Sequence, residues 1–421
     1  MTYRRSILSA AIVTCLGVAV QAHAQDAQPT GTQATDLDTV VVTGIRGSIE
    51  KALDAKRDAA THVEVVTAED IGKLPAKNVA DTLRQLPGVN IASSSASEGG
   101  FDEADRVSLR GTNPSLTQTL VNGHTIGTGD WFVLSQVGNV GRSVSYSLYP
   151  SEIVDRVVVH KTSEAKLVEG GTAGSVNIIT RRPLQFAEPL TIQGSIGAVH
   201  SDLPGDTKPQ LDALLNWRND EGTAGFLVQV FNEQRSLRRD GQEVVGGYGT
   251  IAEFEADGVT RTPVATSNPD LVGVLYPNLI GAALFEQVRK RQGGVANIEA
   301  KVTDDLTLNV NAFYSRLKAD NYNRNYMMWA SQFINARAPS SYTIENGVLT
   351  SATYAPDTTS TAVTPYGVYD MISRPGAEST SKYIALDAEW NASDALKFVF
   401  QLGSTKGNGS SPTQDVLETG I

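Results

Sequence analysis

The second half of the chain alternates apolar and polar residues with a period of two. After Phe186, seven runs place apolar side chains on one face and Gln, Asp, Asn, Glu and Lys on the other. The runs are LTIQGSIGAV, QLDALLNW, AGFLVQVF, ANIEAKV, LTLNVNAFY, KYIALDAEW and LKFVFQL. This period indicates strands with one apolar face, and about ten such residues per strand are typical of a transmembrane barrel.

The connections between these runs support the same reading. Tight polar turns at 219–222, 303–305 and 391–394 alternate with a moderate connection at 200–209 and long ones at 233–291 and 320–379. A barrel that rises from the periplasm has short turns at one end and long loops at the other, whereas a soluble sandwich has no such parity. We therefore predict about seven antiparallel strands in a curved, unclosed sheet.

The first 24 residues are typical of a secretory signal. Arg4 and Arg5 are followed by an apolar stretch at 7–20 and by Ala22-His23-Ala24, a small-x-small cleavage site. The apolar stretch is shorter than the roughly 20 residues that a membrane-spanning helix needs. The single cysteine, Cys15, lies inside it, so the mature protein is expected to have no disulfide and no thiolate metal site.

Residues 25–59 are expected to form a flexible segment that ends in a short helix. Residues 25–37 are polar and small, which predicts disorder. Val40, Val41 and Val42 form a β-branched patch suited to adding a strand to a partner's sheet. Residues 47–58 have the spacing of an amphipathic helix.

Residues 60–185 are predicted to form a small mixed α/β domain. Strands are expected at 63–66, 89–91, 106–110, 119–121, 154–160 and 175–180. Thr67 and Asp70 form a candidate cap for a short helix through Ile71, and Asn78 precedes a second helix at 79–86 that Pro87-Gly88 ends.

Three blocks of this domain carry a family resemblance. VEVVTAEDIGKLPAKNVADTLRQLPGVNI, RVSLRGTNPSLTQTLVNGHTI and EIVDRVVVHKTSEAKLVEGGTAGSVNIITRRPL, in this order, resemble the plug domain of TonB-dependent outer-membrane receptors. Upstream, DTVVVTGIRGSIEKALDAKRDA is similar to the TonB-box region of the branch common in Xanthomonas- and Caulobacter-type bacteria.

The resemblance implies an architecture and a partner. A plug domain at 60–185 would be followed, over 186–421, by the first strands of a β-barrel that has 22 strands in the family, so the sequence is expected to be an N-terminal portion. Thr39, Val40, Val41, Val42 and Thr43 would bind the periplasmic C-terminal domain of TonB, which is linked to an inner-membrane motor. The alternative is that these residues are simply the first strand of a domain.

A second set of residues matches recurrent plug positions and is interpreted as structural framework. The set comprises Arg106, Arg110, Gly111, Asn122, Gly123, Gly170, Gly171 and Gly174. Asn122-Gly123 suits a tight turn that needs positive φ. Buried plug arginines are expected to pair with carboxylates of the barrel, because an unpaired buried charge is costly.

Ligand candidates are sought in the long irregular segment at 124–150. Trp131 and Phe132 lie among glycines beside Asp130 and Gln136, a combination suited to stacking on a sugar and binding its hydroxyls. Alternatively, both aromatic residues pack into the plug core. The resemblance implies active uptake of an extracellular small molecule, with oligosaccharides favoured and ferric siderophores next. A passive outer-membrane channel or adhesin is the rival function.

Other functions find little support in the sequence. His62, His124, His160 and His200 lack zinc-like spacing, and no nucleophile-base pair or phosphate loop is recognised. No enzyme activity, cofactor or metal is therefore expected. The net charge of -11 argues against nucleic acid. The remaining aromatic clusters are expected to form the two interfacial girdles of a barrel in outer-membrane lipid.

Overall fold

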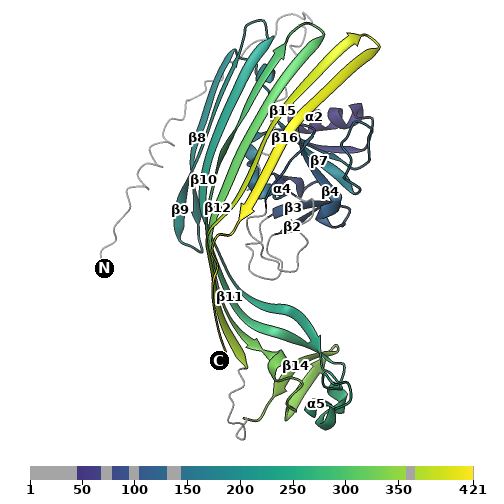
Figure 1. The fold of residues 1–421 in the computed structure, drawn as a ribbon, viewed down its shortest axis with the longest axis vertical. Coiled ribbons are helices and arrows are strands. Elements are labelled where there is room, and N and C mark those ends of the chain that lie inside the picture. Colours follow the sequence, from purple (N-terminus) through teal and green to yellow (C-terminus); the bar gives the residue numbers. More distant parts are fainter. Residues whose placement is uncertain (1–44, 68–77, 94–103, 130–143, 357–365, 421) are drawn as a thin grey trace, which may run out of the picture. The chain divides into compact units, whose positions relative to one another are not determined.

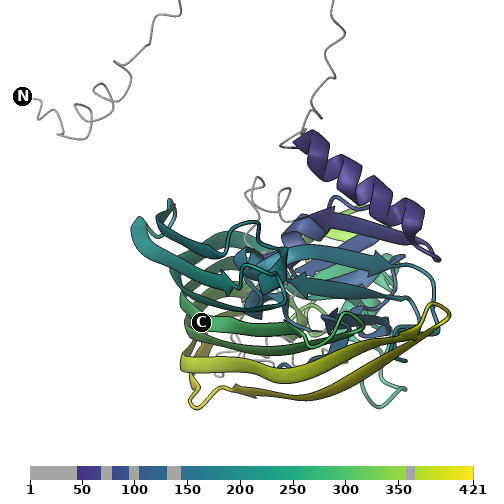
Figure 2. The same cartoon turned by 90° about the horizontal axis from the view of Figure 1, so that it is seen from above.

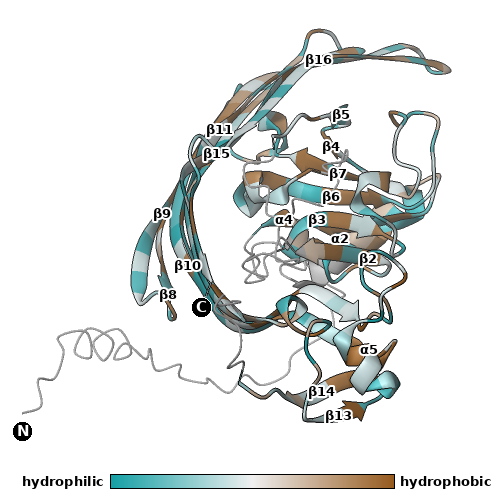
Figure 3. Ribbon diagram, turned by 60° about the horizontal axis from the view of Figure 1, so that its bottom comes forward, coloured by the Kyte–Doolittle hydropathy of each residue, from teal (hydrophilic) through white to brown (hydrophobic). Residues whose placement is uncertain are grey.

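The computed structural model describes residues 45–67, 78–93, 104–129, 144–356 and 366–420. Up to residue 185 the described residues form a small mixed α/β domain, and from residue 190 they form a large antiparallel sheet. Figure 3 shows the large sheet curving past one side of the small domain. The predicted fold class, a small α/β domain followed by antiparallel strands, is confirmed.

The small domain is built on a five-stranded sheet with the order β1-β6-β7-β4-β5. Among the described residues, a separate hairpin, β2-β3, and the helices α2 and α4 flank this sheet (Figures 1 and 2). The elements are α2 (Ile45–Asp58), β1 (Val63–Thr67), α4 (Val79–Leu83), β2 (Val89–Ser93), β3 (Ala104–Leu109), β4 (Thr117–Val121), β5 (His124–Thr125), β6 (Val154–His160) and β7 (Gly174–Thr180). Short 3-10 turns lie at Pro114–Leu116, Tyr146–Leu148, Ser151–Ile153 and Pro183–Gln185. All six predicted strands are present.

Helix α4 begins where the sequence predicts and ends earlier. The side chain of Asn78 accepts a hydrogen bond from the Asp81 amide at 3.1 Å, so Asn78 is the N-cap. The helix was predicted to run to Leu86, and that prediction is wrong, because its last residue is Leu83. Pro87 disfavours helical backbone at Leu86, the residue before it. The Leu86 amide donates instead to the Leu83 carbonyl oxygen in a turn.

The core of the small domain lies between its sheet, α4 and the β2-β3 hairpin. Its largest fully buried side chains are Leu83, Leu109, Leu120, Tyr146, Leu148, Tyr149, Ile153 and Ile178. The same apolar cluster continues into side chains of the large sheet, among them Leu214, Leu227, Phe231 and Phe313. Burial of apolar surface contributes roughly 25 cal/mol per Å². In this cluster it stabilises both the small domain itself and its contact with the large sheet.

The large sheet contains the seven predicted strands in sequence order. They are β8 (Leu190–Ser201), β9 (Asp206–Arg218), β10 (Ala224–Thr250), β11 (Leu275–Lys301), β12 (Leu306–Trp329), β15 (Gly367–Ser393) and β16 (Leu396–Ser410). Each pairs antiparallel with the next. A further strand, β17 (Asp415–Gly420), pairs with the first part of β15. The sheet is not closed into a barrel among the described residues.

Four strands extend far beyond the predicted length. Strands β10, β11 and β15 have 27 residues each and β12 has 24, so much of the predicted loops at 233–291 and 320–379 is strand. The β10-β11 ladder runs from Ala224 opposite Ala300 to Thr250 opposite Leu275, with one irregularity between Val245 and Tyr248. The apolar alternation stops at mid-strand because both faces become polar there, while backbone pairing continues.

Further described residues of those two long connections, 251–274 and 330–356, fold together, and we call them the outer subdomain. It contains α5 (Pro263–Ser267), β13 (Ser341–Glu345), β14 (Val348–Thr353) and 3-10 turns at Pro269–Leu271 and Ala330–Gln332 (Figure 1). Ile251, Val264, Leu271, Ile334 and Leu349 share one buried cluster, so the two connections stabilise each other.

The outward face of the large sheet is apolar and exposed near its tight turns. Ile192, Ile298, Ile384 and Leu402 are between 56 and 73% exposed. The rings of Trp217 and Phe226 lie 5.7 Å apart, and those of Trp390 and Phe398 5.4 Å apart. An apolar band that ends in aromatic pairs is suited to lipid. No helix among the described residues is long and apolar enough to cross a bilayer.

Candidate functional site

The inward face of the large sheet binds the small domain through polar side chains. Gln229 donates to the Glu152 carbonyl oxygen at 3.1 Å, and Asn216 donates to that of Pro183 at 3.2 Å. Both side chains are almost fully buried. The amide side chains pair with buried carbonyl groups and so avoid the cost of unpaired polar atoms. These hydrogen bonds fix the position of the small domain along the strands, in addition to the apolar contacts.

An aromatic stack lies at the centre of the interface. The ring of Phe313 lies 5.1 Å from that of Tyr149 and 5.5 Å from that of Tyr383, and both pairs are stacked. The Tyr149 hydroxyl is 2.9 Å from the Ser381 hydroxyl. Burial raises the pKa of Tyr149 above its ordinary value, so the phenol stays neutral and serves as a hydrogen-bonding group.

A short extended segment, residues 123–129, crosses the inward face of β15 and β16. The His124 Nε2 atom lies 2.7 Å from a carboxylate oxygen of Asp387, to which Gln401 also donates at 3.2 Å. The Gly127 amide donates to Thr405 at 2.7 Å, and its carbonyl oxygen accepts from Ser381 at 2.8 Å. A cavity of about 310 Å³ opens beside this segment.

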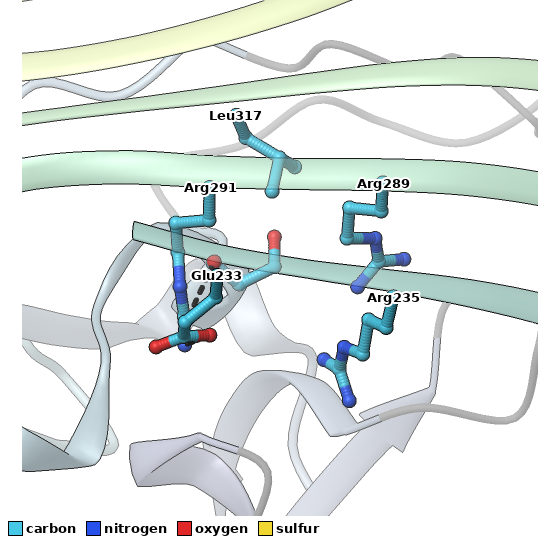
Figure 4. A pocket seen from close by; sticks show the side chains of 6 residues that line it. Glu233, Arg235, Arg289, Arg291 and Leu317 are labelled. Atoms are coloured by element: carbon cyan, nitrogen blue, oxygen red, sulfur yellow. Dashed lines mark hydrogen bonds and ion pairs between the residues drawn. The ribbon is translucent and has the colours of Figure 1, made fainter. Parts of the chain in front are cut away.

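Four arginines lie on the inward face beyond the small domain. Arg235 and Arg239 come from β10, and Arg289 and Arg291 from β11, with Arg235 directly opposite Arg289. Figure 4 shows Arg235, Arg289 and Arg291 projecting from the same side of the two strands. The void lined by Arg235, Arg289 and Arg291 is only about 10 Å³, room for about one water molecule. We call the four arginines the arginine wall.

The arginine wall is joined to both the small domain and neighbouring acids. Arg291 donates to the Ser147 carbonyl oxygen at 2.8 Å and pairs with Glu233 at 2.6 Å. Arg239 pairs with Glu243 at 2.5 Å. Burial, and next the nearby charge of Glu233, raise the pKa of Glu152 in the small domain. Its proton uptake would reduce the negative charge beside Arg291.

A row of amide side chains continues the inward face beyond the arginines. Asn321, Asn323 and Asn325 follow each other on β12 and are at most 9% exposed. Gln287 of β11 donates to Asn321 and accepts from Arg289 at 2.8 Å. Alternating amides and guanidinium groups offer both donors and acceptors, which suits a polar ligand.

The opposite end of the small domain joins α2 to the sheet edge. Strand β1 is the edge strand, and its residue Glu64 accepts from Lys56 of α2 at 2.7 Å and from Lys161 at 3.1 Å. Burial alone would raise the pKa of Glu64, but hydrogen bonds and charges from the two lysines outweigh it and lower the pKa. Residues 39–43, the predicted coupling segment, precede α2 and lie outside the described residues.

Four of the predicted framework residues occupy tight turns, whereas Arg106 lies in β3. Arg110, Gly111, Asn122 and Gly123 have φ between 51° and 84°. The Asn122 side chain accepts from the Thr180 amide at 3.0 Å, which joins the turn to β7. Gly170, Gly171 and Gly174 surround the turn before β7, where Gly174 has φ 130°.

The two arginines singled out are not buried, so the pairing expected of buried plug arginines does not apply to them. Arg110 is exposed and donates to the Lys161 carbonyl, and Arg106 pairs at 3.5 Å with Asp105 of its own domain. Arg182, which was not singled out, lies 3.8 Å from Glu299 of β11.

Two further predictions fall outside what the structure describes. The ligand candidates Asp130, Trp131, Phe132 and Gln136 lie in residues 130–143, and the candidate cap at Thr67 and Asp70 extends into residues 68–77. Among the residues that are described, no three His, Cys, Asp or Glu side chains are grouped to hold a metal ion.

Sequence reasoning missed the arginine wall and the pair of His124 with Asp387. The arginines lie in segments that were interpreted as loops, although Arg235 and Arg239, like Arg289 and Arg291, are separated by even numbers of residues. That period-two spacing was the available signal. No local signal links His124 to Asp387, because 263 positions separate them.

Comparison with known proteins identifies the small domain. Residues 55–176 match the family profile described as TonB-dependent Receptor Plug Domain. The ferrienterobactin receptor of Escherichia coli (strain K12) is 29% identical over 180 residues, which are 42% of this chain and 22% of that protein. The vitamin B12 transporter BtuB of Photobacterium profundum is 30% identical over 168 residues, which are 40% of this chain and 24% of that protein.

The solved structures that resemble this chain include a mutant ferric enterobactin receptor, PfeA, from Pseudomonas aeruginosa. It is 13% identical with a TM-score of 0.35, and the match covers 85% of this chain and 58% of that one. The chain thus matches about a quarter or less of the length of the curated relatives given above. The small domain is a receptor plug. Through this domain the chain is similar to TonB-dependent receptors.

Proposed function

We propose that this protein takes up a scarce nutrient across the bacterial outer membrane, with energy supplied through TonB. The supporting observation is a plug domain bound to the inward face of a curved sheet whose outward face is apolar and exposed. A passive channel or adhesin, the rival function, has no need of a plug held by buried hydrogen bonds. In this proposal residues 1–24 direct export and residues 25–59 tether the plug to TonB.

The coupling step depends on residues 39–43, next to α2. TonB would add a strand to this segment, and the pull would reach the plug through α2 and the Lys56-Glu64 contact to β1. Replacing Val41 with Pro removes a strand donor. We expect the V41P variant of the full-length protein to bind ligand normally and to lose uptake, whereas V41T keeps its amide and most uptake.

For the ligand we propose an anionic iron chelate of the ferric siderophore class. The arginine wall supports this class, since guanidinium groups on a partly dry surface attract anions. The two relatives described above are named as a ferrienterobactin receptor and a vitamin B12 transporter. Neither name favours an oligosaccharide as the ligand. An oligosaccharide stays the second candidate, because the amide row at Asn321, Asn323 and Asn325 suits hydroxyl groups.

Two variants separate these ligand classes. Arg289→Gln should weaken binding of a ferric siderophore about tenfold or more and make the remaining binding less dependent on salt. Asn323→Ala, its matched variant on β12, should affect a neutral oligosaccharide more than an anionic chelate. Trp131→Ala tests the proposed aromatic contact in the same assays. Uptake that continues in a strain without TonB would refute the proposed energy coupling.

A further inference from the structure

Three hydrogen-bond acceptors form a row across the inward face of the large sheet, near the end that carries the outer subdomain. Asn325 of β12 is directly opposite Asp370 of β15, and Asp370 is directly opposite Glu418 of β17. Residues directly opposite on adjacent strands lie on the same face, with Cβ atoms about 4.5–5.5 Å apart. We call these three residues the acceptor row.

The two carboxylates of the row have no cationic partner. Like charges directly opposite each other are unfavourable, and among the described residues no Lys, Arg or His side chain pairs with Asp370 or Glu418. Arg374, the one arginine of β15, lies four residues from Asp370, and its Nε donates to Gln414 at 2.7 Å. The arrangement is therefore favourable only if a cation from outside the described chain lies at the row.

Two acceptor atoms of the row are also shielded from water. Asn325 Oδ1 and Asp370 Oδ1 are buried and have no hydrogen-bond partner among the described residues, and Asn325 as a whole is 9% exposed. Hydration alone explains Glu418, which is exposed. It does not explain the two shielded atoms, because a buried acceptor that lacks a donor is costly. The row is thus short of donors as well as of positive charge.

The acceptor row lies on the same face of the sheet as the arginine wall. Arg289 is opposite Ala319 of β12, and Asn325 lies six residues further along that strand, about 20 Å at 3.4 Å per residue. Between the two levels Ile372 of β15 is opposite Val416 of β17, which is 55% exposed. A ligand that extends from the arginines to the row would pass over this apolar pair.

An ammonium group suits the row better than a metal ion does. Ca²⁺ takes roughly six to eight oxygen ligands, whereas the row offers two carboxylates and one amide oxygen. Among the described residues no three His, Cys, Asp or Glu side chains are grouped to hold a metal ion. An ammonium group carries only donors, and their directions adapt to acceptors on adjacent strands.

We infer that the acceptor row binds an ammonium group of the transported ligand, while the arginine wall binds its anionic iron-chelating part. The inference rests on the proposed function and narrows its ligand class to ferric chelates that carry a cationic arm. The arm would lie over Ile372 and Val416 and span at most about 20 Å. Asp370 and Glu418 would also repel a chelate whose arm ends in an anionic group, which adds specificity.

The experiment uses the full-length protein in mild detergent and three probes. The first is a synthetic ferric tricatecholate with one aminoalkyl arm, the second is the same chelate after N-acetylation of that arm, and the third is calcium chloride alone. Binding is measured by isothermal titration calorimetry. The test variant is D370N/E418Q. The matched control is D240N/E286Q, which removes the same charge from the outward face of β10 and β11. If D370N/E418Q fails to fold, E418Q replaces it, because Glu418 is exposed.

We expect the wild type and the control to bind the amine-bearing chelate about tenfold or more tightly than the acetylated form, because acetylation removes a charge-assisted contact. The D370N/E418Q variant should bind both forms equally. A wild type without this preference, or a D370N/E418Q variant that keeps it, would overturn the inference. Calcium that binds the wild type but not D370N/E418Q, and that displaces the amine-bearing chelate, would also overturn it, because the row would then be a metal site.

The acceptor row and the proposed function can fail separately. A wild type that binds both chelates equally and takes them up in a TonB-dependent manner would refute the role of the row and leave the proposed function intact. A wild type that binds neither chelate would refute the proposed ligand class, and the inference with it.

Discussion

The imidazole of His124 and the carboxylate of Asp387 meet at 2.7 Å between the plug and the large sheet. Each side chain is 13% exposed, so the contact is largely protected from solvent. Gln401 donates to the same carboxylate, which therefore collects two donors from different elements. Asp387 thus joins the plug segment at residues 123–129 to two adjacent strands.

Removing the carboxylate should loosen the plug. Asp387→Asn weakens two hydrogen bonds to a charged acceptor, each worth about 1.5–3 kcal/mol. We expect a stability loss of roughly 2 kcal/mol, measured by thermal unfolding of the full-length protein in detergent. The control is Asp202→Asn, since Asp202 lies 3.7 Å from His200 but its side chain is 98% exposed. An equal loss in both variants would contradict the special role of Asp387.

A second prediction concerns the link between α2 and β1. The folded-state pKa of Glu64 is lowered below its ordinary value of 4.5, so its contribution to stability is present above that pH and is lost as pH falls through the folded pKa. Glu64→Gln should cost about 1–3 kcal/mol at about pH 7, since two lysines lose a partly buried partner. Below pH 4.5 the wild type and the variant should converge.

This convergence is measured by calorimetry of both proteins between about pH 3 and pH 7. Asp54→Asn is the matched control, because Asp54 pairs with Arg57 at 2.6 Å on an exposed helix surface. An exposed pair contributes little, so D54N should follow the wild type at every pH. A gap between wild type and E64Q that stays constant down to about pH 3 would contradict the assigned role of Glu64.

The sequence predicts the plug strands and the sheet order because both depend on local apolar periods. The sequence did not predict the end of α4 at Leu83, because the hydrogen bonds of a turn leave no hydrophobic pattern. It did not predict the extra length of β10 either, because both faces of that part of the strand are polar. The outer subdomain was missed for a different reason. Its core joins Leu271 to Ile334 across two connections that the sequence alone treats as independent.

Part of the candidate site was also within reach of the sequence. Asn122-Gly123 was recognised as a turn, and the structure gives both residues positive φ. The contact of Arg291 with Ser147 could not be recognised from the sequence, because it depends on where the plug lies along the sheet. Such register is set by the sum of many buried contacts, and no single motif encodes it.

The third prediction concerns Gly174 at the start of β7. A Cβ atom there would lie 2.5 Å from the His160 carbonyl oxygen and 2.5 Å from the Leu109 side chain, and the residue has φ 130°. Gly174→Ala should therefore destabilise the plug by about 3–5 kcal/mol. In Gly205→Ala, φ is 66° and no atom lies within 4 Å, so a loss of about 1–2 kcal/mol is expected. Similar thermal stabilities for both variants would contradict the packing argument.

The last prediction concerns the outer subdomain, which would receive ligand first in the proposed function. Leu271 is fully buried in the cluster shared by the two long connections, and the Tyr342 hydroxyl donates to the neighbouring Asp270 at 2.7 Å. Leu271→Ala should cost about 2–5 kcal/mol locally and expose residues 251–274 and 330–356 to protease while the plug stays intact. Val259→Ala is the control, because Val259 is 79% exposed and supports no core. Limited proteolysis with mass mapping distinguishes the two. Cleavage first within the plug, or equal cleavage of both variants, would show that the two connections do not stabilise each other.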